Sequence, residues 1–466
     1  MKKGLLASYV AGLTDKEHGE SFRTMLRYFF PEFITSFLLY SMPLILDVIF
    51  ISHLKSTPTY AALGTTNNFI HFLIKMAESF SVGAVILSGQ FNGINATRDV
   101  GRSLRDAFWA AFFFGIGAAL VLYFGASTIL TWYGAHEHII PIAVPFMRIR
   151  AIGVFFMFLF FALIGFMRGI KDTKTPMMLF VVGAVTFVAC DYIFIFGKYG
   201  FPALGLQGSA YATLCQYALM LAIAFTVIAR DPIYRKYSID MFSMFRDTSY
   251  LKNFLTVTWP VAVDKATIAF AYIWLGKMIT GMGFGAQTTF CAVKDIERFA
   301  FLPAIAFAQI ITFLVSNDVR LQKWQDIKSN IKKSIFLASV VVGLMLCLCY
   351  YGLHTIITFF DCTQGITPIV TRVFPMMSVL VFFDLLQLVL SGALRGSGNV
   401  RLVMMVRLMI CLCYFGPFSY ILAQLPLQDQ TMKFMLVYGS FYIGNALMSL
   451  LYIQRFRGQD WKTHSV

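Results

Sequence analysis

Charged residues are scarce in this chain of 466 residues. Only 13% of the residues are Asp, Glu, Lys or Arg, whereas 58% are hydrophobic and 16% are aromatic. Soluble domains carry about a quarter charged residues and less than half apolar residues. Polar linkers between domains are also missing, because apolar runs of about 20 residues follow one another with only short polar gaps. This composition excludes a soluble enzyme, a secreted disulfide scaffold and a disordered chain, and it indicates a protein that crosses the membrane many times.

The eight cysteines show no pattern of a metal site. The pairs Cys347/Cys349 and Cys411/Cys413 lie in apolar segments without a nearby histidine. We interpret them as small hydrophobic side chains that pack between helices. The sequence therefore predicts no cofactor.

Twelve segments are long and apolar enough to cross a hydrocarbon core of about 30 Å as helices. We place these spans near residues 28–54, 68–92, 105–130, 140–167, 176–197, 203–229, 252–277, 286–315, 334–357, 368–394, 401–423 and 431–454. The predicted fold class is an all-α integral membrane protein with twelve transmembrane helices. Residues 1–27 show no cleavable signal peptide, and they predict an amphipathic cytoplasmic segment that lies on the membrane surface.

The basic residues are distributed unevenly between the predicted loops. The N-terminal segment and every second gap between spans hold 26 Lys and Arg residues, whereas the alternate gaps hold only Lys55, Lys198, Lys277 and Lys433. Short loops rich in Lys and Arg stay in the cytoplasm. We therefore expect a multi-pass protein of the plasma (inner) membrane with both termini in the cytoplasm. The net charge of +15 then reflects membrane topology, and nucleic acid is not an expected partner.

Three short patterns recur in order along the chain, which predicts an internal duplication. The pairs are Pro43-x-x-x-Asp47 with Pro260-x-x-x-Asp264, Lys75-x-x-Glu78-x-Phe80 with Lys294-x-x-Glu297-x-Phe299, and Leu163-x-Gly165-x-x-Arg168-Gly169 with Leu390-x-Gly392-x-x-Arg395-Gly396. Their offsets are 217, 219 and 227 residues.

Each half has six spans, an even number, so the two halves are expected to be parallel, pseudo-symmetric six-helix bundles. We place the first bundle at 28–229, a cytoplasmic linker at 230–251, the second bundle at 252–454 and a cytoplasmic tail at 455–466. Two equivalent bundles are the arrangement that alternating access requires.

Two acidic residues of the first half lie within spans and have no cation close in sequence. An ionisable group near mid-membrane costs at least about 2.5–3.5 kcal/mol, so each is a candidate functional residue. Asp47 and Asp191 each precede a Lys of the outer loops by seven or eight residues. Both therefore lie ~10–12 Å below the outer surface, and we interpret the pair as a proton or Na⁺ site. Pro43, one turn before Asp47, leaves one carbonyl without its donor and can bend the helix.

In the second half, Asp384 lies mid-span with Gln387 three residues later on the same face, and Asp264 also lies near mid-depth. We predict coupling or substrate binding for these three residues. Glu78 and Glu297 are weaker candidates, because each is expected to pair along its helix with Lys75 or Lys294. The arginines Arg148, Arg150 and Arg372 are expected near the membrane interfaces.

These residues and motifs resemble those of the multidrug and toxin compound extrusion (MATE) family. The resemblance rests on PLILD (43–47), GFMRGIKDTKTP (165–176), CDYIFIFGKYGFPALGLQGSAYAT (190–213) and GALRGSGN (392–399), and it covers essentially the whole chain. It implies export of amphipathic, usually cationic drugs or metabolites in exchange for Na⁺ or H⁺, by rocking of two six-helix lobes around a central cavity.

The resemblance also implies roles for individual residues. Asp47 and Asp191 match the two acids of the N-lobe cation site, Thr213 matches its hydroxyl ligand, and Asp384 matches the acid of the C-lobe. The three N-lobe residues would form the Na⁺ site if the coupling ion is sodium.

Two positions depart from the family pattern. Phe187 stands where sodium-coupled members often have Asn, although Thr186 beside it can substitute. Ile268 stands where some branches have Glu, and Asp264, one turn earlier on the same face, is the residue that could replace it.

The first hypothesis is therefore a secondary active antiporter, not an enzyme, that exports a small organic, usually cationic substrate. We expect it to act as a monomer surrounded by membrane lipid. A flippase for lipid-linked precursors, of the same superfamily, is the alternative, and Arg150, Arg298 and Arg372 keep it open. The major facilitator fold is disfavoured because its loop signature is not met by GINATRDVGR (93–102). A membrane enzyme or a channel is less favoured, because no loop holds a catalytic constellation or a selectivity ring.

Overall fold

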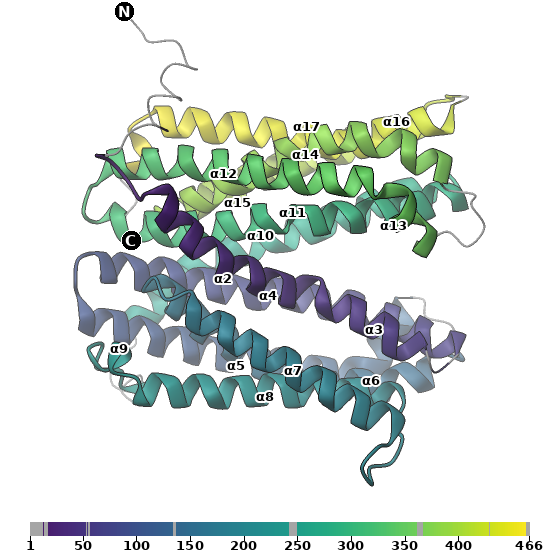
Figure 1. The fold of residues 1–466 in the computed structure, drawn as a ribbon, viewed down its shortest axis with the longest axis horizontal. Coiled ribbons are helices and arrows are strands. Elements are labelled where there is room, and N and C mark those ends of the chain that lie inside the picture. The colour runs from purple at the N-terminus through teal and green to yellow at the C-terminus, as the bar shows by residue number, and fades with distance from the viewer. Residues whose placement is uncertain are drawn as a thin grey trace, which may run out of the picture. The chain divides into compact units, whose positions relative to one another are not determined.

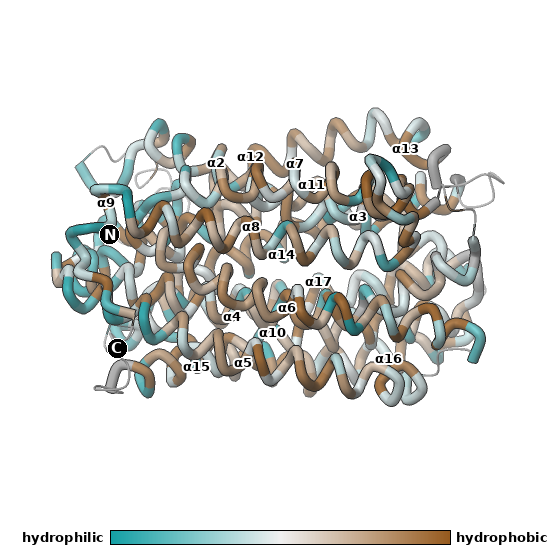
Figure 2. The backbone as a smooth tube through the Cα atoms, turned by 90° about the horizontal axis from the view of Figure 1, so that it is seen from below, coloured by the Kyte–Doolittle hydropathy of each residue, from teal (hydrophilic) through white to brown (hydrophobic). Residues whose placement is uncertain are grey.

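The computed structural model describes residues 17–52, 54, 56–133, 137–241, 249–360, 367–427 and 429–462, together with Leu13. Within these residues every regular element is a helix, and eleven helices are long and apolar enough to cross a membrane (Figure 1). Hydrophobic residues fill the helix middles and hydrophilic residues gather at the helix ends (Figure 2). The predicted all-α membrane fold is confirmed.

The predicted first span, 28–54, is divided into two helices. Helix α2 (Phe22–Tyr40) ends one residue before Ser41, and α3 (Met42–Ser52) begins one residue after it. Pro43 has no N–H to donate to the carbonyl of Leu39, so the ladder of helical hydrogen bonds is weakest at this point. The break explains why the eleven spanning helices do not include this one as a continuous helix.

The chain divides into two compact units. One, which we call the N unit, is Ile34–Ala262, and the other, the C unit, joins Met1–Phe33 to Val263–Val466. The boundaries fall inside α2 and inside α10 (Ser249–Thr280).

Aromatic contacts explain both boundaries. In the C unit, Phe29 of α2 stacks on Phe307 with ring centres 4.8 Å apart. In the N unit, Phe254 of α10 packs against Phe80. The first part of α2 therefore packs in the core of the C unit, and the first part of α10 packs in the core of the N unit.

In the N unit, the elements are α4 (Thr57–Gly93), α5 (Thr97–Trp132), α6 (Ile140–Gly169), α7 (Lys174–Phe196), α8 (Leu206–Arg230) and the short α9 (Pro232–Arg235). Helix α6 packs against α4, α5 and α8, and α7 packs on α8. Gly165 and Gly169 of α6 face Ser81 and Ser88 of α4, where an added Cβ would overlap atoms of α4. The small residues therefore permit the close approach of two helices.

The C unit repeats this packing. Its elements are α11 (Phe284–Val319), α12 (Trp324–Tyr351), α13 (Leu353–Phe360), α14 (Thr367–Gly396), α15 (Val400–Met409), the π-helical η2 (Ile410–Phe415), α16 (Gly416–Gln424), α17 (Gln430–Arg457) and the 3-10 turn η3 (Asp460–Lys462). Helix α14 packs against α11, α12 and α17, as α6 does against α4, α5 and α8. Gly392 and Gly396 of α14 face the α11 backbone at Ala308 and Thr312.

The offset between equivalent helices shows which of the three sequence matches join equivalent positions. Helices α4 and α11 begin at 57 and 284, and α5 and α12 begin at 97 and 324, a difference of 227 residues in both cases. The glycine motif shares this offset, but the Pro–Asp match (217) and the Lys–Glu match (219) fall eight to ten residues short. These two matches do not join equivalent positions: Glu78 and Glu297 lie about two helical turns apart in the repeat. The duplication is confirmed, and two of the three patterns that suggested it are corrected.

Two segments meet at the start of α12 in the C unit. The N–H of Gly19, just before α2, donates to Asp326 (2.9 Å), and the N–H of Glu20 donates to Asn330 (2.7 Å). After α17, the fully buried Trp461 packs edge-on against Trp324. Residues near both ends of the chain therefore lie at the same end of this unit.

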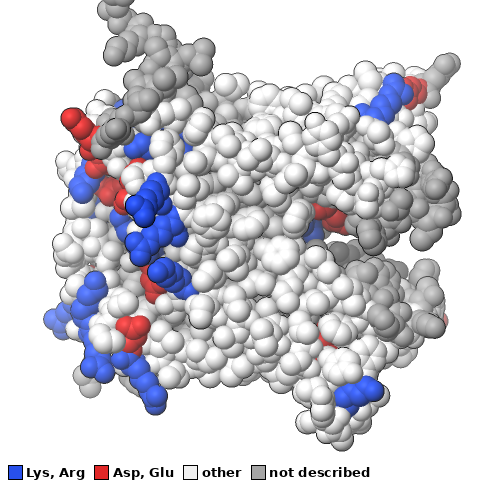
Figure 3. All heavy atoms as spheres, in the orientation of Figure 1, with Lys and Arg blue, Asp and Glu red and all other residues white. Residues whose placement is uncertain are grey.

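Basic side chains also gather at helix ends, with a broad uncharged surface between them (Figure 3). The segment after α8 is held at such an end of the N unit, where the Tyr234 hydroxyl donates to Asp172 (2.5 Å). Burial and the neighbouring carboxylate raise the pKa of Tyr234 above its usual range, so the hydroxyl keeps its proton and its hydrogen bond at physiological pH.

Candidate functional site

The helices that carry Asp47 and Asp191 pack against each other in the N unit. Helix α3 contacts α7, and the rings of Phe50 and Phe196 are 6.2 Å apart. Asp47 precedes Phe50 by three residues and Asp191 precedes Phe196 by five. If both helices run outward, as the topology predicts, the two positions differ in depth by about 3 Å. Asp191 is fully buried, whereas the side chain of Asp47 lies outside the described part of the structure.

Thr213 lies on α8 and is held by an arginine. Its hydroxyl donates to the carbonyl of Ser209 (3.0 Å) and accepts a hydrogen bond from Nη1 of Arg150 (2.6 Å). Arg150 comes from α6, and its Nη2 also donates to Oδ1 of Asn67 on α4 (3.2 Å). Three helices of the N unit thus meet at one buried guanidinium, which corrects the expectation that Arg150 lies near a membrane interface.

A cavity of about 70 Å³ lies beside this guanidinium within the N unit. Its lining includes Tyr40, Pro43, Asn67, Ile70, His71, Ile74, Arg150, Met157, Phe180, Phe187, Thr213, Gln216 and Tyr217. Each ordered water needs at least about 10–15 Å³, whereas drug-sized ligands occupy pockets of about 300–1,000 Å³. The cavity therefore holds a few waters or one head group in this conformation.

Phe187, one of the two positions that depart from the family pattern, lies beside this cavity. Phe187 is buried and lines it. Thr186, the proposed substitute ligand, donates its hydroxyl to the carbonyl of Val182 in its own helix (2.8 Å) and is not among the lining residues.

Glu78 pairs with Lys75 as predicted, with Nζ 3.0 Å from Oε1. The same oxygen accepts a hydrogen bond from the Tyr40 hydroxyl (2.5 Å), and the Lys75 ammonium lies 4.4 Å from the centre of the Tyr40 ring. Tyr40 is the last residue of α2, so this cluster ties the break at Ser41 to α4.

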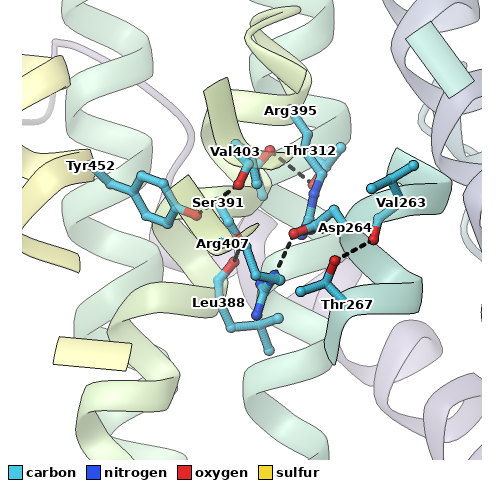
Figure 4. Close-up of polar contacts among 11 residues, drawn as sticks. Val263, Asp264, Thr267, Thr312, Leu388, Ser391, Arg395, Val403, Arg407 and Tyr452 are labelled. Carbon is cyan, nitrogen blue, oxygen red and sulfur yellow. Dashed lines mark hydrogen bonds and ion pairs between the residues drawn. The ribbon is translucent and has the colours of Figure 1, made fainter. Parts of the chain in front are cut away.

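Asp264 is enclosed by two arginines in the C unit (Figure 4). Nη2 of Arg395 on α14 donates to Oδ2 (2.5 Å), and Nε of Arg407 on α15 donates to Oδ1. All three side chains are buried. The arrangement is a buried ion-pair network that joins α10, α14 and α15.

Glu297 does not pair with Lys294, which corrects the prediction from their spacing. Its Oε2 accepts hydrogen bonds from the hydroxyls of Tyr438 and Tyr442 (2.7 Å for Tyr442), both on α17. Lys294 instead lies over the Phe290 ring, 5.3 Å from its centre.

Asp384 is half-buried on α14 and accepts a hydrogen bond from Nδ2 of Asn445 on α17 (3.1 Å). Gln387, three residues later, is fully buried. The C unit therefore places Asp384 and Glu297 both against α17, while Asp264 belongs to the separate arginine network.

Arg150 and Glu32 are among the buried charged residues that the predicted site residues did not include. Arg150 is the eleventh residue of α6, which places it about 15 Å along that helix. Arg148, two residues earlier, is exposed, and residues two apart point about 200° apart on a helix; this spacing was the available signal. Glu32 of α2 was not singled out either, although it is fully buried in the C unit.

Comparison with known proteins identifies the family. The sequence model of the MatE family matches residues 31–193 and 260–421. These two stretches begin 229 and end 228 residues apart, close to the offset of the helices. The chain therefore belongs to the MatE family, the multidrug and toxin compound extrusion transporters.

Individual relatives are distant. The probable multidrug resistance protein YoeA of Bacillus subtilis is 23% identical over 395 residues, which are 83% of this chain and 84% of YoeA. The probable multidrug resistance protein NorM of Bacillus cereus is 24% identical over 412 residues, 85% of this chain and 87% of NorM. A crystal structure described as MATE in the straight conformation has a TM-score of 0.83 at 18% identity, covering 93% of this chain and 95% of that one.

Proposed function

We propose that this chain is a proton-coupled antiporter that exports small amphipathic molecules. The observation that supports protons over sodium is the hydrogen bond from the Arg150 guanidinium to the Thr213 hydroxyl. The relatives named as multidrug resistance proteins support the export of small molecules.

The Arg150 guanidinium would repel a sodium ion bound at Thr213. A Na⁺ bound to this hydroxyl oxygen would lie within about 4 Å of the Arg150 charge, and two like charges at that distance repel by about 4 kcal/mol at an effective dielectric constant of 20. Phe187 supplies no oxygen ligand where sodium-coupled members often have Asn. A proton needs no set of ligands, and Asp191 is fully buried in this region.

Protonation can act on the packing of α3 against α7. Asp191 lies on α7, Asp47 lies on α3, and their positions along the helices have similar depth. Neutralising these acids removes the cost of burying their charge, and so it favours the conformation in which they are most enclosed. A ligand shifts such an equilibrium only by its different affinity for the two states, and the carboxylates supply that difference.

Different roles follow for the acids of the C unit. We propose that Asp384 and Glu297, which both contact α17, contribute to coupling or to substrate binding. Asp264 has a structural role in this proposal, because two arginines already neutralise it.

The flippase alternative is less supported. It would need an arginine-rich cavity, but Arg372 is exposed and lies 3.3 Å from Asp429, and Arg298 lies 3.9 Å from Asp295 with more than a third of its side chain exposed. Of these arginines only Arg150 is buried.

Transport by the full-length protein in proteoliposomes tests the proposal. The probe is the ethyl ester of rhodamine B, a fluorescent amphipathic cation, and either a pH gradient or a sodium gradient at constant pH is imposed. We expect movement of the probe with the pH gradient alone, lost in Asp191→Asn and retained in Asp429→Asn, a matched change at an exposed acid. Movement that requires sodium would contradict proton coupling, and no movement under either gradient would contradict the antiporter.

A further inference from the structure

A short segment after α8 is fixed to one end of the N unit. The hydroxyl of the buried Tyr234 donates to Asp172, which follows α6 (2.5 Å). The hydroxyl of the buried Tyr237 donates to Oδ1 of Asn92 at the end of α4 (2.9 Å). This segment, residues 231–238, which we call the strap, is therefore held against the turns that follow α4 and α6.

The C unit has the same anchor at the duplicated position. At the offset of 227 residues between equivalent helices, Tyr234 corresponds to Trp461 and Asp172 corresponds to Asn399. Trp461 is also fully buried, and its carbonyl accepts a hydrogen bond from Nδ2 of Asn399 (2.9 Å). An aromatic anchor that ties the segment after the last spanning helix to this turn is therefore part of the duplicated fold.

The outward-facing residues of the strap differ between the two units. Pro232 and Ile233 are exposed in the N unit, where 55% of the Ile233 surface is accessible. Their counterparts in the C unit, Gln459 and Asp460, are exposed and polar. The anchor therefore does not require apolar residues at these two positions, and the exposed apolar corner is particular to the N unit.

Four basic side chains surround this corner. They are exposed, and they comprise Arg230, Arg235 and Lys236 beside the corner in the chain and Lys174 in the turn that holds Tyr234. Within the described part of the chain, none of the four forms an ion pair. Their charges are therefore available to a ligand outside the protein.

The two nearest acids in sequence have partners within the fold. Asp231 accepts the N–H of Ile233 (2.9 Å) and so caps α9. Asp172 accepts the N–H of Thr175 (3.1 Å) in addition to the Tyr234 hydroxyl. Both carboxylates therefore fix the local backbone on which the basic side chains stand.

The corner directly follows a membrane span. Helix α8 is long and apolar enough to cross a membrane and ends at Arg230, and α9 lies at the end of the helices where hydrophilic residues gather (Figure 2). The topology predicts the cytoplasmic side for this end. Cytoplasmic leaflets carry anionic lipids that attract Lys and Arg beside a span. An apolar side chain among basic ones can enter the boundary between head groups and acyl chains.

We propose that the exposed corner of the strap and the basic residues around it form a binding site for an anionic phospholipid of the cytoplasmic leaflet. Arg235 and Lys236 bind the phosphate of the head group through charge-assisted hydrogen bonds, and Ile233 contacts the start of the acyl chains. Because buried tyrosines fix the strap to the N unit, the lipid is bound by this unit as a whole. The site involves neither the coupling ion nor the exported substrate, so it does not depend on the proposed function.

Native mass spectrometry of the full-length protein in a non-ionic detergent tests the proposal. The probes are phosphatidylglycerol and phosphatidylcholine with identical acyl chains, and the dissociation constant of the first bound lipid is measured for each. We expect phosphatidylglycerol to bind more tightly. Arg235→Gln together with Lys236→Gln should weaken its binding at least about tenfold, because each basic group near an anionic lipid surface contributes about fivefold.

The duplicated end of the C unit provides the matched control. Arg401 and Arg457 are exposed there and correspond to Lys174 and Arg230. Arg401→Gln together with Arg457→Gln removes the same charge and should leave the tightest binding of phosphatidylglycerol unchanged. Ile233→Ser should weaken this binding severalfold, because apolar contact is lost. All of these changes are at exposed side chains, so the melting temperatures in detergent should be nearly unchanged.

Two kinds of result would overturn the assignment. Equal affinity for the two lipids, or equal weakening by the N-unit and C-unit double variants, would leave only a general attraction of basic helix ends to anionic lipid. Displacement of phosphatidylglycerol by glycerol 1-phosphate at the same concentration would assign the basic residues to a soluble anion instead of a lipid.

Discussion

At the scale of single residues, two buried arginine sites each join several helices of one unit. Asp264 accepts hydrogen bonds from both Arg395 and Arg407, so its charge is compensated inside the protein. Arg150 donates to the hydroxyl of Thr213 and to the amide oxygen of Asn67, which joins α6 to α8 and α4. The first arrangement joins three helices of the C unit, and the second joins three helices of the N unit.

Replacing Asp264 should therefore cost stability rather than coupling. Asp264→Asn leaves two guanidinium groups buried without a counter-ion, and breaking a buried pair in this way costs about 3–5 kcal/mol. We expect a clearly lower melting temperature in detergent, and a partial recovery when Arg407→Leu is added, because one uncompensated charge is then removed. A variant with unchanged melting temperature but lost coupling would instead make Asp264 the replacement for the missing span-seven acid.

The positions of these acids within spans were predictable from sequence, but the partners that come from other helices were not. Hydropathy places Asp191, Asp264 and Asp384 within spans, because the length of an apolar run is a local property. The arginines that neutralise Asp264 lie 131 and 143 residues away, so no local pattern names them. The Lys75–Glu78 pair was predicted because it lies within one helical turn, whereas the tyrosines that bind Glu297 come from another helix.

At the scale of helices, the repeated glycines mark the closest contact in each unit. Gly165 of α6 faces the backbone of Ser81, and Gly392 of α14 faces the backbone of Ala308. The two glycines and the two residues that they face are both 227 positions apart. The contact is therefore part of the duplicated unit.

A methyl group at this contact should disturb the N unit. In Gly165→Ala the new Cβ would overlap the carbonyl of Ser81, and overpacking of this kind costs about 1–3 kcal/mol. The control is Gly117→Ala on the exposed face of α5, where nothing lies within 4 Å of the added Cβ. There alanine should be neutral or stabilising by up to about 1 kcal/mol. Equal melting temperatures for both variants would contradict the assignment of a tight contact.

Two helices cross the unit boundaries at equivalent places. The boundary in α2 follows Phe33 and that in α10 follows Ala262, which differ by 229 residues. Pro31 and Pro260 each lie two residues before the boundary. Composition indicates where a chain is polar, and it does not indicate which core a helix joins.

For the molecule as a whole, duplication and acid placement support one account. In the proposed mechanism, the two halves, whose helix packing is repeated, are the two lobes of alternating access. The N unit places Asp191 on α7 against α3, the helix of Asp47. Arg150 donates a hydrogen bond to the Thr213 hydroxyl, which would be a ligand of a bound sodium ion. In the proposed mechanism, protonation of the N-unit acids is coupled to substrate binding.

Calorimetry of substrate binding tests this claim most directly. The ethyl ester of rhodamine B is titrated into purified protein in buffers of equal pH and different ionisation enthalpy, with and without sodium. If binding releases protons from the N-unit acids, the measured heat should change with the buffer, and Asp191→Asn should remove part or all of that dependence. A heat that is the same in every buffer, and that changes with sodium instead, would contradict the account.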